Sequence, residues 1–404
     1  MRILFVTNNF PNPQEPTRGM FNAQTSRALA RTHEVVVVAP TSWRDAWRSR
    51  GRRPAVPRLE YREGAEVHHP LYWYPPGIFR AAYEWCFWQS VRRTVRTLLL
   101  RFRPEVVLGF WIHPDGGTAV RIARDCNVPG VVMAGGSDVL VLGRNPIRRR
   151  VIAGVLRRAD AVVSVSHHLK GAIEALGVPG GRVHVVDNGV DPGLFFPADR
   201  AMARRRLNLD GSAPMFLWVG RMVPVKGLDV LLDGFATAVS GLPSPRLCLA
   251  GDGPLRDALA RRVVGLGIAD RVRFIGNVAN NELPDWYRAA DVTVLPSWSE
   301  GSPNVLLESI ACGTPFMASA VGGVPEIADA DLDVLVPPGD VNAWAAAIRR
   351  RASSTTEPGP ARLRSTWDQQ AQRLESVFQL ALAARRSPSA GVSGLTELAG
   401  TRVP

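Results

Sequence analysis

Cysteine, lysine and long apolar runs are the scarce features of this sequence. The four cysteines lie far apart and form no C-x-x-C pair: Cys86, Cys126, Cys248 and Cys312. This spacing argues against a disulfide framework and a zinc site, and it is typical of reduced thiols in the cytosol. No stretch of about 18 uninterrupted apolar residues occurs, so a membrane-spanning helix is not expected. The N-terminus lacks a basic segment followed by a long apolar one, so a secretory signal is not expected either.

Two kinds of binding signature are also missing. No G-x-G-x-x-G follows the first apolar strand, where Thr7–Pro11 stands, so a dinucleotide oxidoreductase is not favoured. Two pairs of neighbouring histidines occur, His68-His69 and His167-His168. The members of each pair point apart, and no third ligand has a suitable spacing. The D-x-D-x-D string at 329–333 is interpreted as a solvated loop, so the sequence predicts no metal site.

Basic charge is concentrated in the first half of the chain. The 404 residues carry 49 Lys+Arg against 36 Asp+Glu, a net charge of +13. Residues 1–190 carry 27 basic and 14 acidic side chains, whereas the remainder carries 22 of each. Such asymmetry indicates an anionic partner: phospholipid headgroups, nucleic acid or a polyanionic substrate. The alternative is a compositional bias, because only Lys170 and Lys226 among the basic residues are lysines.

The length exceeds that of one ordinary core and predicts two or three domains. Apolar strands alternating with helices are expected first at Ile3–Thr7, Glu34–Ala39, Glu105–Phe110, Gly130–Ala134, Ala161–Val165 and Val183–Val186. A second series is expected at Met215–Val219, Arg246–Ala250, Val272–Ile275, Val292–Leu295 and Pro315–Ala318. Unbroken valine-rich strands predict parallel sheets covered on both faces. The fold class is therefore α/β, with two doubly wound domains that bind ligands at the carboxyl ends of their strands.

Residues 71–103 form an aromatic and basic stretch. Six aromatic residues precede five arginines: Trp73, Phe79, Tyr83, Trp85, Phe87 and Trp88, then Arg92, Arg93, Arg96, Arg101 and Arg103. Aromatic rings and arginines on one helix suit a membrane interface, where rings lie at headgroup level and guanidinium groups contact phosphates. The alternative is a long helix whose aromatic side chains pack on the first sheet. Both interpretations can hold together, because one face of the helix can contact a membrane while another packs on the sheet.

The strongest local signal follows the expected strand Val292–Leu295. Ser302 is a good N-cap and Pro303 a good first helical residue, so a helix is expected to begin there. Its N–H groups and dipole would bind phosphate in the crevice. Bound phosphate repels carboxylates, so Glu300 and Glu308 are expected to face sugar and ribose hydroxyls instead. The alternative is a structural helix with two solvated glutamates.

A second signal follows the expected strand Met215–Val219. Arg221 and Lys226 leave the end of this strand together. Two cations in the crevice can neutralise a diphosphate and stabilise the charge that develops on a leaving group. Alone, this pair would equally fit a solvated loop. Beside the glutamate segment, it indicates a diphosphate site.

Together these residues resemble the retaining glycosyltransferases of family 4, which have the GT-B fold. Glu300 and Glu308 match the family's E-x7-E signature, and Arg221 and Lys226 match its G-R-x4-K-G pair. Three further matches are the N-G-V-D of 188–191, the G-x-G-P of 251–254 and the G-G-x-x-E of 322–326. The resemblance extends to about Ala384, and the helix expected over Ser365–Ala384 looks like the one that crosses back to the first domain. The segment around Gly19 is similar to a subgroup that assembles bacterial surface polysaccharides.

The resemblance implies a role for each matching residue. Arg221 and Lys226 would hold the diphosphate and stabilise the leaving nucleotide. Glu308 would bind the ribose hydroxyls and Glu300 the transferred sugar. The other donor-binding positions implied are Gly19, Gly276, Asn277, Val278, Gly301, Ser302, Asn304 and Val305. The donor would be a UDP- or GDP-sugar, and neither a metal nor another cofactor would be required.

One position departs from the family pattern. The usual first-domain histidine position holds Phe110, and His113 stands three residues later in the same loop. His113 is predicted to be a catalytic or acceptor contact, and a structural loop histidine is the alternative. Asp115 and Asp138, in loops at strand ends, are predicted to bind an acceptor hydroxyl.

The prediction is a GT-B glycosyltransferase that transfers a sugar to an acceptor hydroxyl with retention, in surface polysaccharide or glycolipid synthesis. The expected parts are an acceptor domain (1–195), a nucleotide-sugar domain (196–364), a crossover helix (365–385) and a disordered tail (386–404). The acceptor would be a saccharide or lipid-linked molecule, and the location cytoplasmic, with attachment of the basic domain to an anionic membrane. The alternatives are a GT-B-like sugar-nucleotide epimerase and a basic nucleic-acid-binding protein, although no recognised nucleic-acid module occurs.

Overall fold

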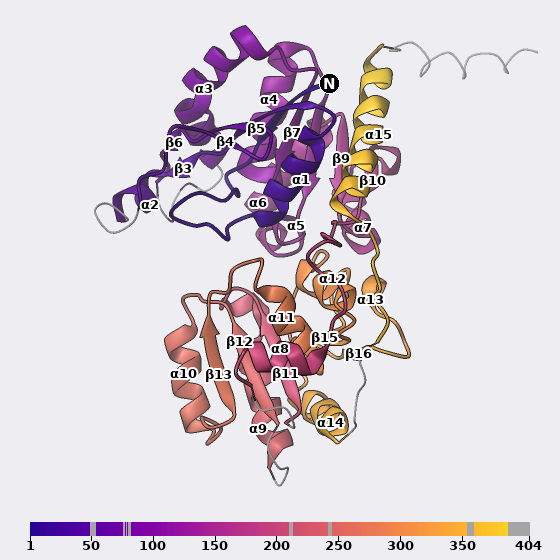
Figure 1. The fold of residues 1–404 in the computed structure, drawn as a ribbon. Coiled ribbons are helices and arrows are strands. Elements are labelled where there is room, and N and C mark those ends of the chain that lie inside the picture. The colour runs from indigo at the N-terminus through magenta and orange to yellow at the C-terminus, as the bar shows by residue number, and fades with distance from the viewer. Residues whose placement is uncertain are drawn as a thin grey trace, which may run out of the picture.

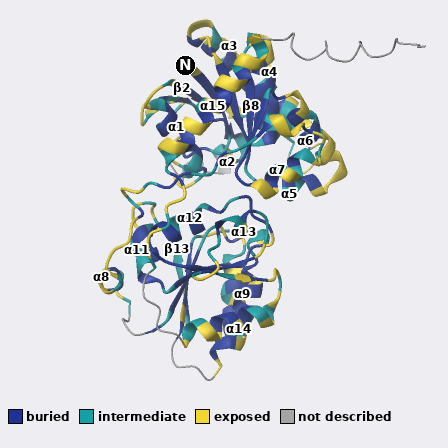
Figure 2. Cartoon of the chain, turned by 90° about the vertical axis from the view of Figure 1, so that its right-hand side faces the viewer, coloured by how far each residue is buried: buried dark blue, intermediate teal, exposed yellow. Residues whose placement is uncertain are grey.

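Two sheets with helices on both faces dominate the computed structural model, one above the other in Figure 1. The structure describes residues 1–48, 54–75, 77, 79, 82–209, 213–240, 245–353 and 359–386. The central strands of both sheets are buried, and the exposed residues lie mainly on the outer helices and loops (Figure 2). The predicted α/β fold with two doubly wound layers is therefore confirmed.

The first sheet has the strand order β10-β9-β8-β7-β1-β2-β5-β4. Its strands are β1 (Arg2–Val6), β2 (Glu34–Val38), β4 (Leu59–Arg62), β5 (Ala65–His68), β7 (Val106–Phe110), β8 (Gly130–Ala134), β9 (Ala161–Ser164) and β10 (Val183–Val185). All pair in parallel except β4 with β5. The sequence analysis missed this antiparallel edge because its residues alternate in burial and form no unbroken apolar run.

The second sheet has the order β13-β12-β11-β14-β15-β16 and is parallel throughout. Its strands are β11 (Met215–Val219), β12 (Arg246–Ala250), β13 (Val272–Gly276), β14 (Val292–Leu295), β15 (Phe316–Ser319) and β16 (Val334–Val336). The five strands predicted here are confirmed to within one residue, and β16 was not predicted. A small two-stranded sheet, β3 (Thr41–Ser42) with β6 (Leu71–Tyr72), lies beside the first sheet.

Alternate residues along each strand of the first sheet face different helices. On one face, Leu4, Val6, Val36 and Val107 pack against α3 (Tyr83–Phe102) and α4 (Gly117–Cys126), and Val132 and Val162 pack against α6 (Pro146–Arg158) and α7 (His167–Glu174). Ile3, Phe5, Val35 and Leu108 pack against the other, formed by α1 (Met20–Ala30) and α15 (Trp367–Arg386). The two-residue period of a strand produces this division.

Helices also cover both faces of the second sheet. One face carries α8 (Arg200–Arg206), α11 (Leu283–Ala289), α12 (Asn304–Ala311) and α13 (Val324–Ile327). The other carries α9 (Leu228–Val239), α10 (Arg256–Gly265) and α14 (Val341–Ala352). Two short helices, α2 (Trp43–Arg48) and α5 (Ser137–Leu140), belong to the first half of the chain.

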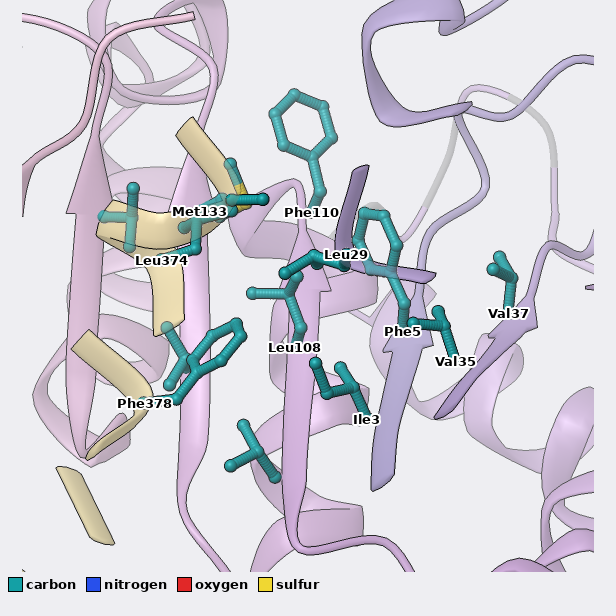
Figure 3. Close-up of a cluster of buried hydrophobic side chains, with 14 of the residues drawn as sticks. Ile3, Phe5, Leu29, Val35, Val37, Leu108, Phe110, Met133, Leu374 and Phe378 are labelled. Atoms are coloured by element: carbon teal, nitrogen blue, oxygen red, sulfur yellow. The ribbon is translucent and has the colours of Figure 1, made fainter. Parts of the chain in front are cut away.

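The last helix returns to the first sheet, as predicted. Leu374 and Phe378 are fully buried in the same apolar cluster as Ile3 and Leu108 (Figure 3). The helix begins at Trp367 instead of Ser365 and extends to Arg386. The expected disordered tail, apart from Arg386, lies outside the described residues. The predicted domain limits at 195, 364 and 385 stay predictions.

The connection that leads to α15 is anchored on the second domain by an ion pair. Arg362 donates to both oxygens of Asp333, at 2.6 and 2.9 Å. Asp333 also accepts hydrogen bonds from the backbone N–H groups of Phe316 and Asp329. Its side chain is fully buried, so the interpretation of 329–333 as a solvated loop is wrong at Asp333. Arg362, which neutralises Asp333, lies in a later segment of the chain, so the D-x-D-x-D string by itself does not reveal this partner.

The aromatic stretch before and within α3 divides between two environments. Phe87 and Trp88 are buried against the first sheet, as the packing alternative predicted. Trp73, Phe79 and Trp85 remain 54%, 76% and 61% exposed. None of the described helices combines the length and apolar composition needed to cross a bilayer.

Replacement of Leu374 by alanine is expected to lower the free energy of unfolding by about 2–5 kcal/mol, because it leaves a cavity in the first core. Urea unfolding followed by tryptophan fluorescence would measure the loss. Leu380→Ala on the same helix is the control, since Leu380 is 57% exposed and should change stability by less than about 0.5 kcal/mol. Equal effects of the two variants would contradict the packing of α15 as a core element.

Candidate functional site

The predicted donor residues meet at the carboxyl end of the second sheet. Arg221 follows β11, Gly276 ends β13, and Glu300 follows β14. β11 pairs with β14, so the loops after these two strands are neighbours. A parallel sheet brings such loops to one edge, where α/β proteins bind ligands.

Lys226 and Glu300 form an ion pair at this edge. The Lys226 Nζ donates to Glu300 Oε1 at 2.7 Å, and the side chains are 24% and 10% exposed. The Trp298 N–H donates to the Val225 carbonyl at 2.8 Å and joins the two loops. Gly227 has φ +61°, and a Cβ there would lie 2.1 Å from the Pro296 carbonyl oxygen. The glycine after Lys226 thus permits the close approach of the two loops.

Arg221 lies beside this pair and stays exposed. Within the described parts of the chain its side chain makes no hydrogen bond and no ion pair. Its guanidinium group is therefore available to an anionic ligand at the end of β11. Gly276 ends β13, which β12 separates from β11 in the sheet, and Asn277 directly after it is exposed.

The Glu300–Gly301 loop is enclosed by glycines on two sides. A Cβ on Gly301 would lie 2.5 Å from the Gly135 carbonyl oxygen of the first domain. A Cβ on Gly322, which has φ +57°, would lie 1.8 Å from the Glu300 carbonyl oxygen. A side chain at Gly301 or Gly322 would push the neighbouring backbone segments apart. The two glycines therefore fix the position of Glu300 between the two domains.

The helix after Glu300, α12, begins at Asn304. Pro303 is the N-cap and has extended dihedral angles, φ −76° and ψ 112°. No side chain caps this terminus, so the prediction of Ser302 as N-cap and Pro303 as first helical residue is wrong by one position. The cap proline offers no oxygen on its side chain, and the first-turn N–H groups at Asn304 and Val305 are left for another acceptor.

A chain of side-chain hydrogen bonds leads from this helix to the first domain. Asn188 Nδ2 donates to Asn304 Oδ1 at 2.7 Å, and Gln370 Nε2 donates to Asn188 Oδ1 at 3.3 Å. Thr25 Oγ1 donates to Gln370 Oε1 at 2.8 Å. The chain thereby joins α12, the N-G-V-D segment, α15 and α1. The sequence analysis identified Asn188 and Asn304 but not their contact.

Glu308 lies on α12 beside a tyrosine that the sequence analysis missed. The Tyr287 O–H donates to Glu308 Oε2 at 2.8 Å. Burial raises the pKa of Glu308 to about 7, against the opposing effect of this hydrogen bond. A tyrosine within the apolar pattern of 283–290 signals a buried hydroxyl in need of a partner, but not which partner it finds.

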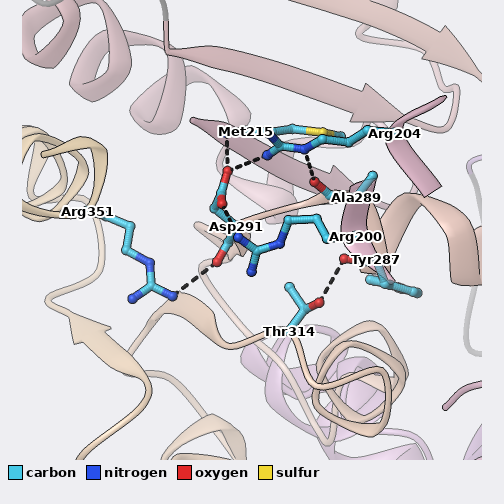
Figure 4. Close-up of polar contacts among 8 residues, drawn as sticks. All are labelled: Arg200, Arg204, Met215, Tyr287, Ala289, Asp291, Thr314 and Arg351. Atoms are coloured by element: carbon cyan, nitrogen blue, oxygen red, sulfur yellow. Dashed lines mark hydrogen bonds and ion pairs between the residues drawn. The ribbon is translucent and has the colours of Figure 1, made fainter. Parts of the chain in front are cut away.

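The turn between α11 and β14 is held by a polar cluster (Figure 4). Arg200 and Arg204 donate to the two oxygens of Asp291, each at 2.7 Å. Arg204 also donates to the Ala289 carbonyl at 2.9 Å, and Thr314 Oγ1 donates to the Tyr287 carbonyl at 2.7 Å. These contacts fix α11, and with it the Tyr287 ring.

The first domain contributes a glycine loop and a cavity to the same region. Gly19 precedes α1 with φ +61°, and a Cβ there would lie 2.0 Å from the Asn9 carbonyl oxygen. The cavity has a volume of about 230 Å³. Aromatic walls, helix α6 and a polar floor enclose it: Asn8, Tyr72, Tyr74, Tyr83, Trp111, His113, Pro114, Asp138, Leu142, Arg148, Val151 and Ile152.

The predicted acceptor residues differ in access. His113 lines the cavity and is half-buried, whereas Phe110 packs against Phe21 in the core, at a ring distance of 4.9 Å. Asp138 reaches the cavity floor, but its carboxylate accepts N–H groups from Gly135, Gly136 and neighbouring residues. These bonds favour a role in shaping the loop, and contact with an acceptor stays a prediction.

Asp115 does not line the cavity and has no exposed surface. It accepts the Asn8 N–H at 2.5 Å, and burial raises its pKa to about 8. It therefore supports Asn8 in the cavity wall, and its predicted contact with an acceptor is not favoured by this position. Among the described residues, no three His, Cys, Asp or Glu side chains could hold a metal ion.

Two family models match the chain. The model for glycosyl transferases group 1 matches residues 213–354, and the model for a glycosyl transferase 4-like domain matches residues 20–189. Together they cover most of the chain and correspond to the two sheets.

Curated relatives carry glycosyltransferase names. A D-inositol 3-phosphate glycosyltransferase of Streptosporangium roseum is 43% identical over 190 residues, 44% of this chain and 43% of its own. A Bacillus subtilis protein named as the teichuronic acid biosynthesis glycosyltransferase TuaC is 27% identical over 369 residues, 87% of this chain and 89% of its own. The chain spans about half the length of the inositol-phosphate enzymes that it matches.

Solved structures share the fold at low sequence identity. Sucrose-phosphate synthase from Thermosynechococcus elongatus has a TM-score of 0.72 and 22% identity, covering 95% of this chain and 97% of its own. HepE of Anabaena, solved with UDP-glucose, has a TM-score of 0.69 and 20% identity, covering 95% and 99%.

The buried carboxyl of Asp115 predicts a loss of stability as the pH rises. The folded protein keeps this proton up to a pKa of about 8, whereas the unfolded chain releases it near 3.8. Between these values the unfolded state binds fewer protons, so the free energy of unfolding falls as the pH rises. Asp115→Asn keeps the acceptor for Asn8 and removes the titration, so its melting temperature should fall less between about pH 6 and pH 9. Asp125→Asn, at an exposed position of α4, is the control, and equal pH slopes in Asp115→Asn and wild type would contradict the assignment.

Proposed function

Since the chain belongs to the glycosyltransferases of the GT-B fold, with group 1 and family-4-like domains, we propose that it transfers a sugar from a nucleotide-diphosphate donor to an acceptor hydroxyl. The anomeric configuration is retained. The observation that carries the proposal is the Lys226–Glu300 ion pair, with the Arg221 guanidinium and the uncapped terminus of α12 in the same crevice. Cations and N–H groups bind a diphosphate, and the carboxylate faces the sugar hydroxyls.

Each group has a role in the reaction. The bond between the anomeric carbon and the diphosphate breaks, and negative charge grows on the leaving phosphate. Arg221 and Lys226 stabilise this charge more than that of the bound donor, and this difference lowers the barrier. A leaving phosphate oxygen accepts the proton of the acceptor hydroxyl, which attacks from the same face. HepE shares the fold and is solved with UDP and with UDP-glucose, and this supports the donor class.

The acceptor reaches the donor from the first-domain cavity. Asp138 lines this cavity, and the loop of Gly135 and Gly136 just before it contacts the backbone of Gly301. An acceptor seated there lies next to the sugar held by Glu300. Aromatic walls suit the apolar face of a sugar ring, and Arg148 and His113 offer polar contacts to its substituents. The likeness to TuaC favours cell-surface polysaccharide synthesis as the setting, and an epimerase would need no such cavity.

Attachment to an anionic membrane completes the proposal. The adjacent helices α3, α4 and α6 carry 11 arginines against 2 acidic residues. Exposed Trp85 lies on α3, and Arg121 of α4 stacks over Trp88 at 5.1 Å. Exposed aromatic rings beside arginines suit the headgroup region of a bilayer with acidic lipids. A nucleic-acid partner is not favoured, because the sequence contains no recognised nucleic-acid module.

The donor site is tested by thermal stabilisation with UDP, GDP and their sugar conjugates. At about 100 times Kd, a nucleotide should stabilise the fold by about 2.7 kcal/mol and raise the melting temperature by several degrees. Lys226→Ala and Glu308→Ala should lose this rise. Lys170→Ala is the matched control, because Lys170 is the other lysine of the chain and pairs with Glu174 on α7. A rise that persists in Lys226→Ala would contradict the site.

The membrane surface is tested by flotation with phosphatidylglycerol-containing liposomes. Replacing Arg92, Arg93 and Arg96 by glutamate should abolish flotation at physiological salt, since each basic residue near an anionic surface contributes about 1 kcal/mol. The control places glutamate at three exposed second-domain arginines, Arg205, Arg206 and Arg261. Flotation that is unchanged by the first set, or lost equally in both sets, would refute attachment through α3.

A further inference from the structure

The two carboxylate oxygens of Glu308 have different surroundings. Oε2 accepts the Tyr287 O–H at 2.8 Å. No other hydrogen bond to this carboxylate occurs among the described residues, and the side chain is half-buried. Oε1 is therefore the oxygen left for a ligand in the crevice.

The Tyr287 hydroxyl is placed by the fold and not by a ligand. Its ring is fully buried and contacts Phe195 at a centroid distance of 6.1 Å. Thr314 bonds its carbonyl, and Arg204 bonds the carbonyl of Ala289 at the end of the same helix (Figure 4). Burial and the neighbouring Glu308 hold the pKa of Tyr287 well above its usual value, so the hydroxyl remains a donor.

We propose that Tyr287 is a positioning residue of the donor site: its hydroxyl donates a hydrogen bond to Oε2 of Glu308 and thereby directs Oε1 toward the ribose hydroxyls of the nucleotide. The inference rests on the proposed function and adds a residue that the E-x7-E signature does not contain. A carboxylate held at one oxygen loses little further side-chain freedom when the ribose binds.

The same contact controls when Glu308 is ionised. An O–H donor favours the charged carboxylate, whereas burial favours the neutral form, and the pKa of Glu308 lies at about 7. The other titratable group beside it is Cys312, whose pKa burial raises to about 12, so it stays neutral. Arg288 and Asp285, on the same helix as Tyr287, pair with each other at 3.1 Å. Removal of the phenol should therefore raise the pKa of Glu308 further and weaken ribose binding near neutral pH.

The test is isothermal titration of the nucleotide diphosphate that stabilises the wild type, from about pH 5.5 to pH 9. Affinity should rise with pH as Glu308 ionises. Tyr287→Phe should bind on the order of tenfold more weakly at pH 7 and reach its midpoint at higher pH. The difference between variant and wild type cancels the titration of the nucleotide's own phosphates. Tyr61→Phe, which removes the hydroxyl of a 77% exposed tyrosine of the first domain, should keep the wild-type midpoint.

The outcomes separate this inference from the proposed function. A wild type that binds no nucleotide overturns both. A wild type that binds, with an unchanged midpoint in Tyr287→Phe, overturns the role of Tyr287 alone. In a Glu308→Gln background, Tyr287→Phe should no longer move the pH profile, whereas a persistent shift would also refute the inference.

Should Tyr287→Phe fail to fold, fluorotyrosine-labelled wild type replaces it. The chain has 5 tyrosines, and the other four lie in the first domain: Tyr61, Tyr72, Tyr74 and Tyr83. Fluorination makes the phenol a stronger donor, which favours ionised Glu308 and should move the midpoint to lower pH. A midpoint equal to that of the unlabelled protein would overturn the proposal.

Discussion

Backbone contact between glycines determines the arrangement of the site. The Glu300–Gly301 loop fits between Gly135 and Gly136 of the first domain and Gly322 and Gly323 of the second. Only because no side chain intervenes can the loop meet both neighbours. Glu300 then stands where Lys226 reaches it, and the acceptor cavity lies next to the donor crevice. The polar chemistry of the site thus depends on positions that have no side chain at all.

The parts of the fold that follow local patterns could be predicted from the sequence. Valine-rich strands between helices predicted both parallel sheets, and apolar spacing in 365–384 predicted the returning helix. The edge hairpin β4–β5 was not predicted, because its strands are short and half exposed. Ser302 resembled an N-cap by residue type, yet Pro303 takes that position because its extended backbone ends the loop. Such a shift by one residue is decided by backbone dihedral angles, which composition does not reveal.

The candidate site was predictable where motifs are contiguous and unpredictable where contacts span the chain. Glu300, Lys226 and Arg221 were found by their spacing after strand ends. The contact of Tyr287 with Glu308 and that of Asn188 with Asn304 join segments with no shared local pattern. The hydrogen bond of Asp115 with the Asn8 N–H likewise joins residues more than a hundred positions apart in sequence. Polar contacts between residues far apart in sequence are therefore the part of the site that the sequence alone does not predict.

The return of α15 to the first sheet also has a consequence for biosynthesis. Leu374 and Phe378 cover strands that leave the ribosome near the start of translation. Until that helix emerges, one face of the first sheet remains partly bare and its apolar residues are open to wrong contacts. The N-terminal domain therefore completes its core only after the C-terminal domain has been synthesised. The acceptor domain therefore completes its folding after the donor domain has been synthesised. A fragment that ends after the last strand of the first sheet lacks part of the apolar core of that domain.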